Sequence, residues 1–431
     1  MEQRPDPHAT AAAPTVAEIV EGCLAAHGRW EPQLHAFAWI GPEGARRRAQ
    51  ELDAILPGDR GRLHGLPIGV KDLIDTAGIP TEHGSPVFRG RVPERDASAV
   101  QRLLDDGAII FGKTVTAELA YFEPGATTNP WNPARTPGGS SMGSAAAVAA
   151  RVIAGAVGTQ TNGSVIRPAA FCGVVGFKPT AGRLPRDGVL PFSTSLDQLG
   201  VFAPNVSRAA LLAAVIAGDP PGDGTAGESI PPPPMLAAVR TPEWKDAEPS
   251  ARAQFEQDIE MARAAGAEVS ELTMPGELAE ALAVHRIIMA AEAHRLVGPL
   301  VAAQREKVSR QLLALLDEGE AITTDSYQRA LGGQRALQGL FQEWAGGVDA
   351  ILTLPALGEA PSTATTGDPR CCTRWTLVGA PALTVPTGFG PSRLPLGVQL
   401  VGHRDHDAEL VAVARWFESL RPSVASPAPP A

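Results

Sequence analysis

Two glycine- and serine-rich turns flank a segment of small residues near the middle of this chain, between residues 136 and 179. The first turn covers residues 137–141 and the second covers residues 158–164, and both contain serine. Glycine adopts backbone conformations that other residues avoid, and it lets the main chain approach a ligand closely. We therefore expect backbone N–H groups and hydroxyls of the two turns to converge on one reacting carbonyl group.

Composition narrows the class of protein. The chain has 431 residues, which is enough for a large core and for two or three domains. Its formal net charge of −10 argues against a nucleic-acid-binding face, and the arginines at 46–48 are typical of a solvated helix surface. The four cysteines have neither the spacing of a zinc site nor the pattern of a disulfide framework, so we expect free thiols in a reducing compartment. The N-terminus lacks an apolar signal segment and no apolar run is long enough to span a bilayer, so we expect a cytoplasmic protein.

Hydrophobic periodicity predicts that helices and strands alternate, as in an α/β fold. A helix is expected from a capping box at Thr15 and Glu18, and a fully buried helix at residues 144–157. Further helices are expected at 42–56, 96–106, 250–266, within 276–344 and at 407–420. Strands are expected at 66–70, 109–111, 174–177, 201–203, 235–239, 266–269, 350–353, 382–385 and 397–401. No strand is expected in the loop at 123–139.

Domain boundaries follow from the same pattern. We predict one domain at residues 15–420 between disordered tails at 1–14 and 421–431. A proline-rich connector at 218–234 lies within this domain. The helical part at 276–344 is predicted to form substrate-specificity walls.

Three lysines, Lys71, Lys113 and Lys178, each follow or end a short apolar strand. Burial disfavours the charged form of a lysine and lowers its pKa toward that of a useful base. A neutral lysine can activate a serine hydroxyl, as in the Ser-Lys variants of the Ser-His-Asp triad. The alternative is that each lysine reaches the surface or pairs with an acid, and the local pattern does not choose among the three.

Other site patterns are weaker. His403 and His406 lie three residues apart without further metal ligands, which favours a surface turn over a metal site. Residues 139–143 match the G-x-S-x-G nucleophile elbow, but that elbow needs a strand before it, and the preceding segment is rich in proline. No glycine-rich loop has the ending of a phosphate-binding P-loop.

Five segments together resemble the amidase signature family. They are LHGLPIGVKD (63–72), AIIFGKT (108–114), PGGSSMGSAAAVAA (137–150), GTQTNGSVIRPAAFCGVVGFKPT (158–180) and LPLGVQLVG (394–402). The resemblance covers almost the whole chain, and the block from 137 to 180 is highly specific. It implies a single α/β/α domain around a large mixed, mostly parallel twisted sheet covered by helices, with no cofactor and no metal.

The resemblance also implies a Ser–cisSer–Lys triad. By position Ser164 is the nucleophile, Ser140 the serine after a cis peptide bond, and Lys71 the base. Lys113 falls in a motif that is structural in the family, so the resemblance selects Lys71. The remaining implied residues form the oxyanion hole with Ser164 or support the relay: Thr161, Asn162, Gly163 and Ser141.

Four positions depart from the family pattern. Gln160 replaces the usual aspartate, Met142 replaces a glycine, and Arg167 lies one place later than the usual arginine. Asn162 stands where glycine or alanine is usual, and it either contacts substrate or favours the turn's backbone. These departures leave the specificity open.

The resulting functional hypothesis is a serine hydrolase that cleaves the amide C–N bond of a small molecule, with ester and carbamate bonds as further substrates. We expect neither a nucleic-acid partner nor association with a membrane, and the sequence leaves open whether the chain forms a homodimer. One alternative is the glutamine-hydrolysing A-type subunit of an amidotransferase, which the proline-broken C-terminal tail and acidic charge disfavour. Another is a non-catalytic binding protein of this fold, which the intact Lys71, Ser140 and Ser164 disfavour.

Overall fold

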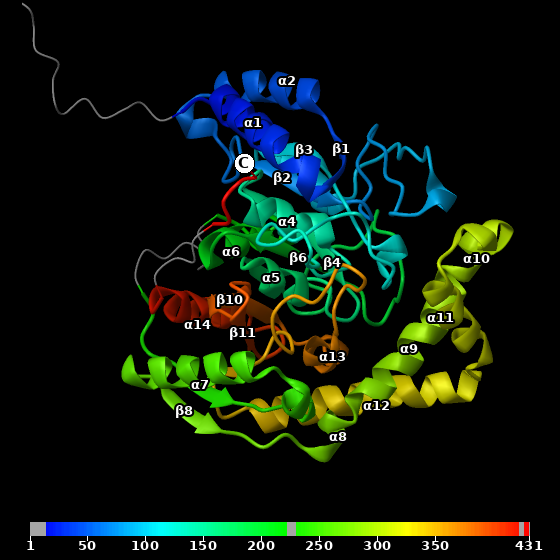
Figure 1. Cartoon of the computed structure of the whole chain (residues 1–431), viewed down its shortest axis with the longest axis vertical. Coiled ribbons are helices and arrows are strands. Elements are labelled where there is room, and N and C mark those ends of the chain that lie inside the picture. Colours follow the sequence, from blue (N-terminus) through cyan, green and yellow to red (C-terminus); the bar gives the residue numbers. More distant parts are fainter. Residues whose placement is uncertain (1–13, 222–229, 422–425, 431) are drawn as a thin grey trace, which may run out of the picture.

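A large mixed sheet organises the molecule. The computed structural model describes residues 14–221, 230–421 and 426–430. Eleven strands form one sheet in the order β1-β3-β2-β4-β6-β5-β10-β11-β9-β7-β8. Their bounds are β1 Phe37–Ile40, β2 Pro67–Lys71, β3 Ile109–Thr114, β4 Gly155–Gln160, β5 Val175–Lys178, β6 Gln198–Ala203, β7 Met235–Ala238, β8 Glu268–Glu271, β9 Ala350–Thr353, β10 Ala382–Phe389 and β11 Pro395–Val401. The predicted α/β architecture is confirmed (Figure 1).

Helices cover both faces of this sheet. Their bounds are α1 Val16–Leu34, α2 Pro42–Asp53, α3 Ser98–Asp105, α4 Met142–Ala149, α5 Ile166–Cys172, α6 Val206–Ala217, α7 Pro249–Ala264, α8 Gly276–Ala279, α9 Ala281–Leu296, α10 Gly298–Val301, α11 Arg310–Ala321, α12 Thr324–Ala345, α13 Arg370–Leu377 and α14 Asp407–Ser419. In Figure 1, α9, α10, α11 and α12 are grouped together at one side of the molecule. The predicted capping box of α1 is present, because Thr15 accepts from the Glu18 backbone and Glu18 caps the Thr15 backbone.

Strand directions correct one detail of the prediction. Four neighbouring pairs are parallel and six are antiparallel, so the sheet is mixed but not mostly parallel. One cause is the short connection between β10 and β11, which allows only an antiparallel hairpin. The parallel pairs lie in two groups, β3-β2-β4 and β9-β7-β8.

The segment between the two glycine-rich turns also differs from the prediction. The expected helix at 144–157 ends at Ala149, and β4 begins at Gly155. Arg151 has a left-handed backbone with φ 56°, which stops the helix. Strand β4 lies between β2 and β6, and small residues are needed there, because a Cβ atom would lie 2.5 Å from Leu212 at Gly155 and 2.7 Å from Phe202 at Gly158. Helices α5, α6 and α13 and strand β1 were not predicted.

Two apolar layers enclose the sheet. One packs α3, α6, α7 and α14 on one face of the sheet, and side chains such as Leu236 and Ala238 point into it. The intervening Ala237 points into the other layer, which packs α9, α11, α12 and α13. Helices α1, α4 and α5 enclose a third apolar cluster. Helix α4 packs against both β2 and β4, and it also packs against α5.

The ends of the chain are described in part. Residues 1–13 of the predicted N-terminal tail, 222–229 of the connector, and 422–425 and 431 of the C-terminal tail lie outside the described residues. Residues 426–430 contain no helix or strand, and Ser426 Oγ accepts a hydrogen bond of 2.6 Å from Arg151 Nε. The division into tails and one domain stays a prediction. Among the described helices, none is both long and apolar enough to cross a membrane.

Candidate active site

Lys71 ends the buried strand β2 and is fully buried itself. Its Nζ donates hydrogen bonds to Ser140 Oγ at 2.8 Å and to Thr159 Oγ1 at 2.7 Å. Burial holds the pKa of Lys71 well below its usual value, the Asp197 carboxylate opposes this shift, and the Arg167 guanidinium adds to it. Burial therefore favours the neutral amine, which is the form that can accept a proton.

The other two lysines do not contact the serines of the two turns. Lys113 Nζ donates to the Ile74 carbonyl and to Thr76 Oγ1, and burial lowers its pKa to about 8. Lys178 Nζ donates to carbonyl and amide oxygens around the end of β5, and burial lowers its pKa to about 7. All three lysines are buried, and Lys71 is the one whose amine contacts Ser140.

The first glycine-rich turn is packed tightly against α5. The peptide bond between Gly139 and Ser140 is cis, and Gly138 has φ 83°. A Cβ atom at Gly138 would lie 2.7 Å from Cα of Pro168 in α5, so only glycine fits there. Ser141 Oγ donates to the Thr159 carbonyl at 3.2 Å, which ties this turn to the end of β4.

The second turn is held by side chains on both of its sides. Gln160 Oε1 accepts hydrogen bonds from the backbone N–H groups of Val165 and Ile166 at 2.8 and 3.1 Å. The Gln160 side chain therefore accepts hydrogen bonds from backbone N–H groups that have no partner within the helix at the start of α5, as a side-chain cap does at a helix N-terminus. Thr376 Oγ1 in α13 donates to the Asn162 carbonyl at 2.6 Å and accepts from Gln160 Nε2 at 2.9 Å.

The backbone N–H groups of this turn remain available to a ligand. Among the described residues, none accepts a hydrogen bond from the N–H of Asn162, Gly163 or Ser164. The Asn162 side chain contacts Thr373 Oγ1 in α13. It also lines the cavity beside Ser164, so both roles considered for Asn162 are compatible with its position.

The two serines line one small cavity of about 20 Å³, together with Thr161, Asn162, Arg167 and other residues. A cavity of this size holds about one water molecule. Within the described part of the chain, no hydrogen bond joins Ser164 Oγ to Ser140 Oγ. A second cavity of about 190 Å³ adjoins the first, and both are lined by Ala120, Thr161 and Phe192.

Two buried acids hold the wall between these cavities. Asp197 accepts hydrogen bonds from Thr161 Oγ1 and from the backbone N–H groups of Phe192 and Ser193. Burial raises the pKa of Asp197, and these donors oppose the shift. Glu292 in α9 accepts from the Ser193 hydroxyl. The segment that carries Phe192 is therefore anchored to both β4 and α9.

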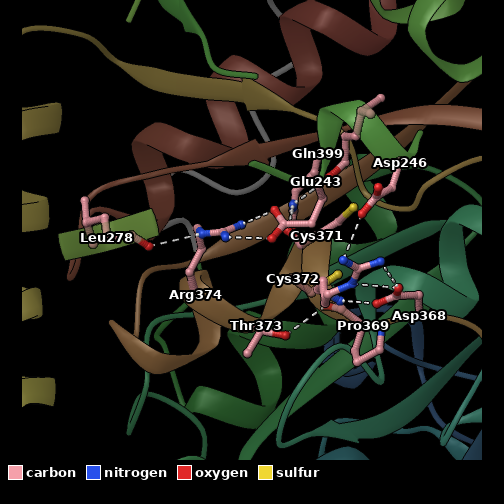
Figure 2. Close-up of polar contacts among 12 residues, drawn as sticks. Glu243, Asp246, Leu278, Asp368, Pro369, Cys371, Cys372, Thr373, Arg374 and Gln399 are labelled. Carbon is pink, nitrogen blue, oxygen red and sulfur yellow. Dashed lines mark hydrogen bonds and ion pairs between the residues drawn. The ribbon is translucent and has the colours of Figure 1, made fainter. Parts of the chain in front are cut away.

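Helix α13, which supports the second turn, is fixed by a buried ion pair (Figure 2). Arg374 forms two hydrogen bonds to Glu243, at 2.7 and 3.0 Å, and its Nε donates to the Leu278 carbonyl. Glu243 belongs to a short 3-10 helix, Pro242–Asp246. At the start of α13, Asp368 accepts from Arg370. The positions of Thr373 and Thr376 thus depend on contacts far away in the sequence.

The alternative site patterns gain no support from the geometry. Among residues 14–221, 230–421 and 426–430, no group of three or more metal-ligating side chains occurs. His403 Nε2 contacts the Val348 carbonyl at 2.8 Å, away from both turns. The hydroxyl of Ser141, the central serine of the G-x-S-x-G match, donates to the main chain rather than to a histidine.

Sequence reasoning missed Thr159, Thr376 and Asp197. The signal for Thr159 was the strand β4, because the carboxyl ends of the parallel strands β2 and β4 meet at one edge of the sheet. The single helix predicted at residues 144–157 includes the start of β4, so this edge of the sheet was not predicted. Thr376 and Asp197 reach the second turn from elements whose packing no local pattern indicates.

Curated relatives match this chain along nearly its whole length. The protein described as the A-type subunit of Glutamyl-tRNA(Gln) amidotransferase from Chloroflexus aggregans (strain MD-66 / DSM 9485) is 35% identical over 460 residues, which cover 94% of this chain and 93% of that protein. The protein with the same description from Roseiflexus sp. (strain RS-1) is also 35% identical, over 458 residues, with coverage of 94% and 93%.

These relatives contradict the predicted partners. We expected a small-molecule amide, ester or carbamate substrate with no nucleic acid, and the relatives are subunits of an enzyme named for a transfer RNA. The physical argument from net charge was too broad. The net charge describes the surface of this chain alone. A polypeptide of a larger enzyme can take part in a reaction on a nucleic acid without binding the nucleic acid itself.

Solved structures and a family model agree on the fold. A structure described as an amidase superimposes with a TM-score of 0.84 at 31% identity, and it covers 94% of this chain and 96% of its own. The corresponding Glutamyl-tRNA(Gln) amidotransferase polypeptide of Thermotoga maritima superimposes with a TM-score of 0.80 at 28% identity, with coverage of 96% and 95%. The Amidase family model matches residues 18–411. The chain therefore belongs to the amidase signature family and is an amide-hydrolysing enzyme.

Proposed function

We propose that this enzyme cleaves amide C–N bonds through an acyl-enzyme on Ser164, with Lys71 as the base and Ser140 as the proton relay. The observation that carries the proposal is the 2.8 Å contact between the buried Lys71 amine and Ser140 Oγ, beside the cavity that Ser164 also lines. Lys113 and Lys178 make no comparable contact with a serine of either turn.

The proton moves in a closed cycle. Neutral Lys71 takes a proton from Ser140, Ser140 takes one from Ser164, and Ser164 Oγ forms a bond to the amide carbon. The relay then returns the proton to the leaving nitrogen as the C–N bond breaks, because an unprotonated amine is a poor leaving group. Water repeats the sequence on the acyl-enzyme and regenerates Ser164.

The developing oxyanion needs preorganised donors. The free backbone N–H groups of Asn162, Gly163 and Ser164 support this assignment, together with Thr161 at the start of the turn. Ser141 supports the relay because its hydroxyl fixes the first turn to Thr159, the second partner of the Lys71 amine.

We further propose that the enzyme serves as the glutamine-hydrolysing A-type subunit of an amidotransferase. Relatives of that description at 32–35% identity, matched over 93–95% of this chain, support this assignment. The side-chain amide of glutamine then provides the acyl group on Ser164 and ammonia leaves. A cytoplasmic location stays a prediction that suits this assignment.

The test is ammonia release from glutamine by the purified chain, with and without the other subunits of a transfer-RNA amidotransferase from the same organism. We expect release to rise on addition of the partner subunits and to vanish in Ser164→Ala. The control is Ser419→Ala, which removes a hydroxyl on α14 whose one hydrogen bond within the described residues goes to the Trp416 carbonyl. Wild-type release by Ser164→Ala would exclude the acyl-enzyme.

A free-standing amide hydrolase is the second candidate. The 31% identical structure described as an amidase supports it, because it is matched over 96% of its own chain. Turnover of simple amides at full rate without partner subunits, with no glutamine hydrolysis, favours this candidate.

A further inference from the structure

Helix α9 places a buried histidine against the turn that carries Ser164. His285 is 1% exposed, and its Nε2 lies 2.9 Å from the carbonyl oxygen of Thr161. Because a carbonyl oxygen can only accept a hydrogen bond, Nε2 is the ring nitrogen that carries the proton and donates the bond. Burial lowers the pKa of His285 to about 4, so the ring is neutral at neutral pH. His285 is therefore a fixed hydrogen-bond donor and not a carrier of charge.

The Thr161 carbonyl depends on His285 for its hydrogen bond. Thr161 is buried, and within the described ranges no backbone N–H and no other side chain donates to its carbonyl oxygen. A buried acceptor without a donor is costly. The contact with His285 therefore stabilises the orientation of the Thr161–Asn162 peptide in which this oxygen faces α9.

The N–H group of the same peptide points the opposite way. The one cis peptide bond among the described residues joins Gly139 and Ser140, so the bond between residues 161 and 162 is trans. The C=O and N–H groups of a planar trans peptide point in opposite directions. Asn162 lines the 20 Å³ cavity, whereas His285 lies behind the turn and is not part of the cavity wall. The contact with His285 therefore directs the free N–H of Asn162 away from α9.

Helix α9 is itself anchored around the site. Met289 lies one turn after His285 on the same face of α9, and it lines the 20 Å³ cavity. Arg286 Nη1 donates to Tyr121 Oη at 2.9 Å, and Tyr121 lines this cavity as well. Nearer the other end of α9, Glu292 accepts a hydrogen bond of 2.6 Å from a tyrosine hydroxyl of α12. These contacts fix the helix from which the histidine reaches the turn.

We propose that His285 is a positioning residue, which holds the Thr161–Asn162 peptide so that the Asn162 N–H acts as an oxyanion donor. The inference rests on the proposed acyl-enzyme at Ser164. Thr376 of α13 holds the next peptide of the turn by its donation to the Asn162 carbonyl. The turn is thus held from α9 as well as from α13. The helical part that was predicted to form substrate walls therefore also supports the chemical step.

A purely structural role makes a different prediction. If His285 only anchors α9, its replacement lowers stability and leaves kcat unchanged. If His285 positions an oxyanion donor, its replacement lowers kcat much more than it changes KM, because such a donor acts mainly on charge that develops in the transition state. A side chain that returns an N–H group to the same place should then restore kcat.

The experiment uses the full chain, with any partner subunits that turnover requires, and three single variants. His285→Met removes the donor and keeps an apolar side chain of similar length. His285→Gln restores an N–H group, because the side-chain nitrogen of glutamine is as many bonds from Cβ as Nε2 of histidine. The matched control is His294→Met on the same helix, since His294 Nδ1 contacts the Leu316 carbonyl of α11 at 3.0 Å and not a residue of either turn. Both kcat and KM are measured for the best amide substrate, and urea unfolding measures stability.

We expect His285→Met to lower kcat by about 10- to 100-fold and to change KM by less than about threefold. His285→Gln should recover most of the lost kcat, and His294→Met should keep the kcat of wild type. If His285→Met does not fold, His285→Asn replaces it, because asparagine keeps the amide but places its nitrogen one bond nearer to Cβ. An unchanged kcat, a loss that resides in KM, or a His285→Gln variant no more active than the variant without the donor would overturn the inference.

A second measurement does not require turnover. The rate at which a fluorophosphonate labels Ser164 also depends on the oxyanion donors, since the phosphoryl oxygen takes the place of the oxyanion. This rate should fall in His285→Met as kcat does, and His294→Met should be labelled like wild type. Equal labelling rates of wild type and His285→Met refute the role of His285 but not the proposed nucleophile. Absence of labelling at Ser164 in wild type refutes the nucleophile itself.

Discussion

The hydroxyl of Thr376 offers a sharp test of how the second turn is held. It donates to the Asn162 carbonyl at 2.6 Å and accepts from Gln160 Nε2 at 2.9 Å. The Asn162 carbonyl and the Gly163 N–H belong to one planar peptide and point in opposite directions. Fixing the carbonyl on α13 therefore directs the N–H away from α13, as an oxyanion donor requires.

Thr376→Val keeps the shape of the side chain and removes both of these hydrogen bonds, together with a longer contact of 3.3 Å from Oγ1 to the Cys372 carbonyl within α13. Each buried partner left unsatisfied costs about 1–3 kcal/mol, so we expect the free energy of unfolding to fall by about 2 kcal/mol or more. Complete loss of one oxyanion donor costs about 2.7–4 kcal/mol in the activation free energy, which sets the upper limit. Partial misorientation of Gly163 should lower kcat by about 10- to 100-fold.

The assay measures kcat and KM for the best amide substrate, together with unfolding in urea. The matched control is Thr384→Val, since Thr384 Oγ1 donates at 2.9 Å to the Val398 carbonyl within the β10-β11 hairpin, in the core of the sheet. This control should lose stability and keep its kcat. An unchanged kcat in Thr376→Val, with the expected loss of stability, would refute the link between α13 and the oxyanion donors.

Three further predictions concern buried ionisable side chains. Burial lowers the pKa of Lys178 from 10.5 to about 7, so the unfolded chain binds more protons than the folded chain between these pH values, and wild-type stability should rise with pH there. Measured by urea unfolding relative to Lys178→Met, the free energy of unfolding should rise by about 3 kcal/mol from about pH 7 to about pH 9.5. A difference between the two proteins that does not change with pH would contradict this prediction. Glu243→Gln should lower the free energy of unfolding by about 3–5 kcal/mol, because Arg374 loses its buried partner. Adding Arg374→Met to this variant should restore part of the lost stability. A loss of less than about 1 kcal/mol in Glu243→Gln would show that the ion pair does not stabilise the fold. Lys71→Met should fold and lower kcat/KM by at least about 100-fold, and activity near that of wild type removes Lys71 as the base.

Sequence patterns predicted those parts of the fold that depend on local periodicity. The capping box at Thr15, the buried strand ending at Lys71 and the return of the chain to the sheet near its C-terminus are all present. The strand β4 escaped prediction because glycine and alanine have low strand propensity. Its place between β2 and β6 is a tertiary effect, and that place decides which residues surround the Lys71 amine.

The candidate site, like the fold, could be predicted only where a local pattern or the family resemblance indicates it. The lysine and the serines could be chosen from the resemblance, and the choice among three buried lysines could not be made from local pattern. Helix α13 illustrates the remainder, since its eight residues include two cysteines and two arginines and do not read as a buried helix. Arg374 is buried because Glu243 lies opposite, 131 positions earlier in the chain, and no local signal connects them.

The most direct test of the central claim is peptide mass spectrometry of the enzyme quenched with acid during amide turnover. The account predicts a mass increase equal to the substrate's acyl group on the peptide that contains Ser164, and no such increase in Lys71→Met. An acyl group on any other residue, or turnover of wild type with no acylated peptide under conditions in which the acyl-enzyme accumulates, would contradict it.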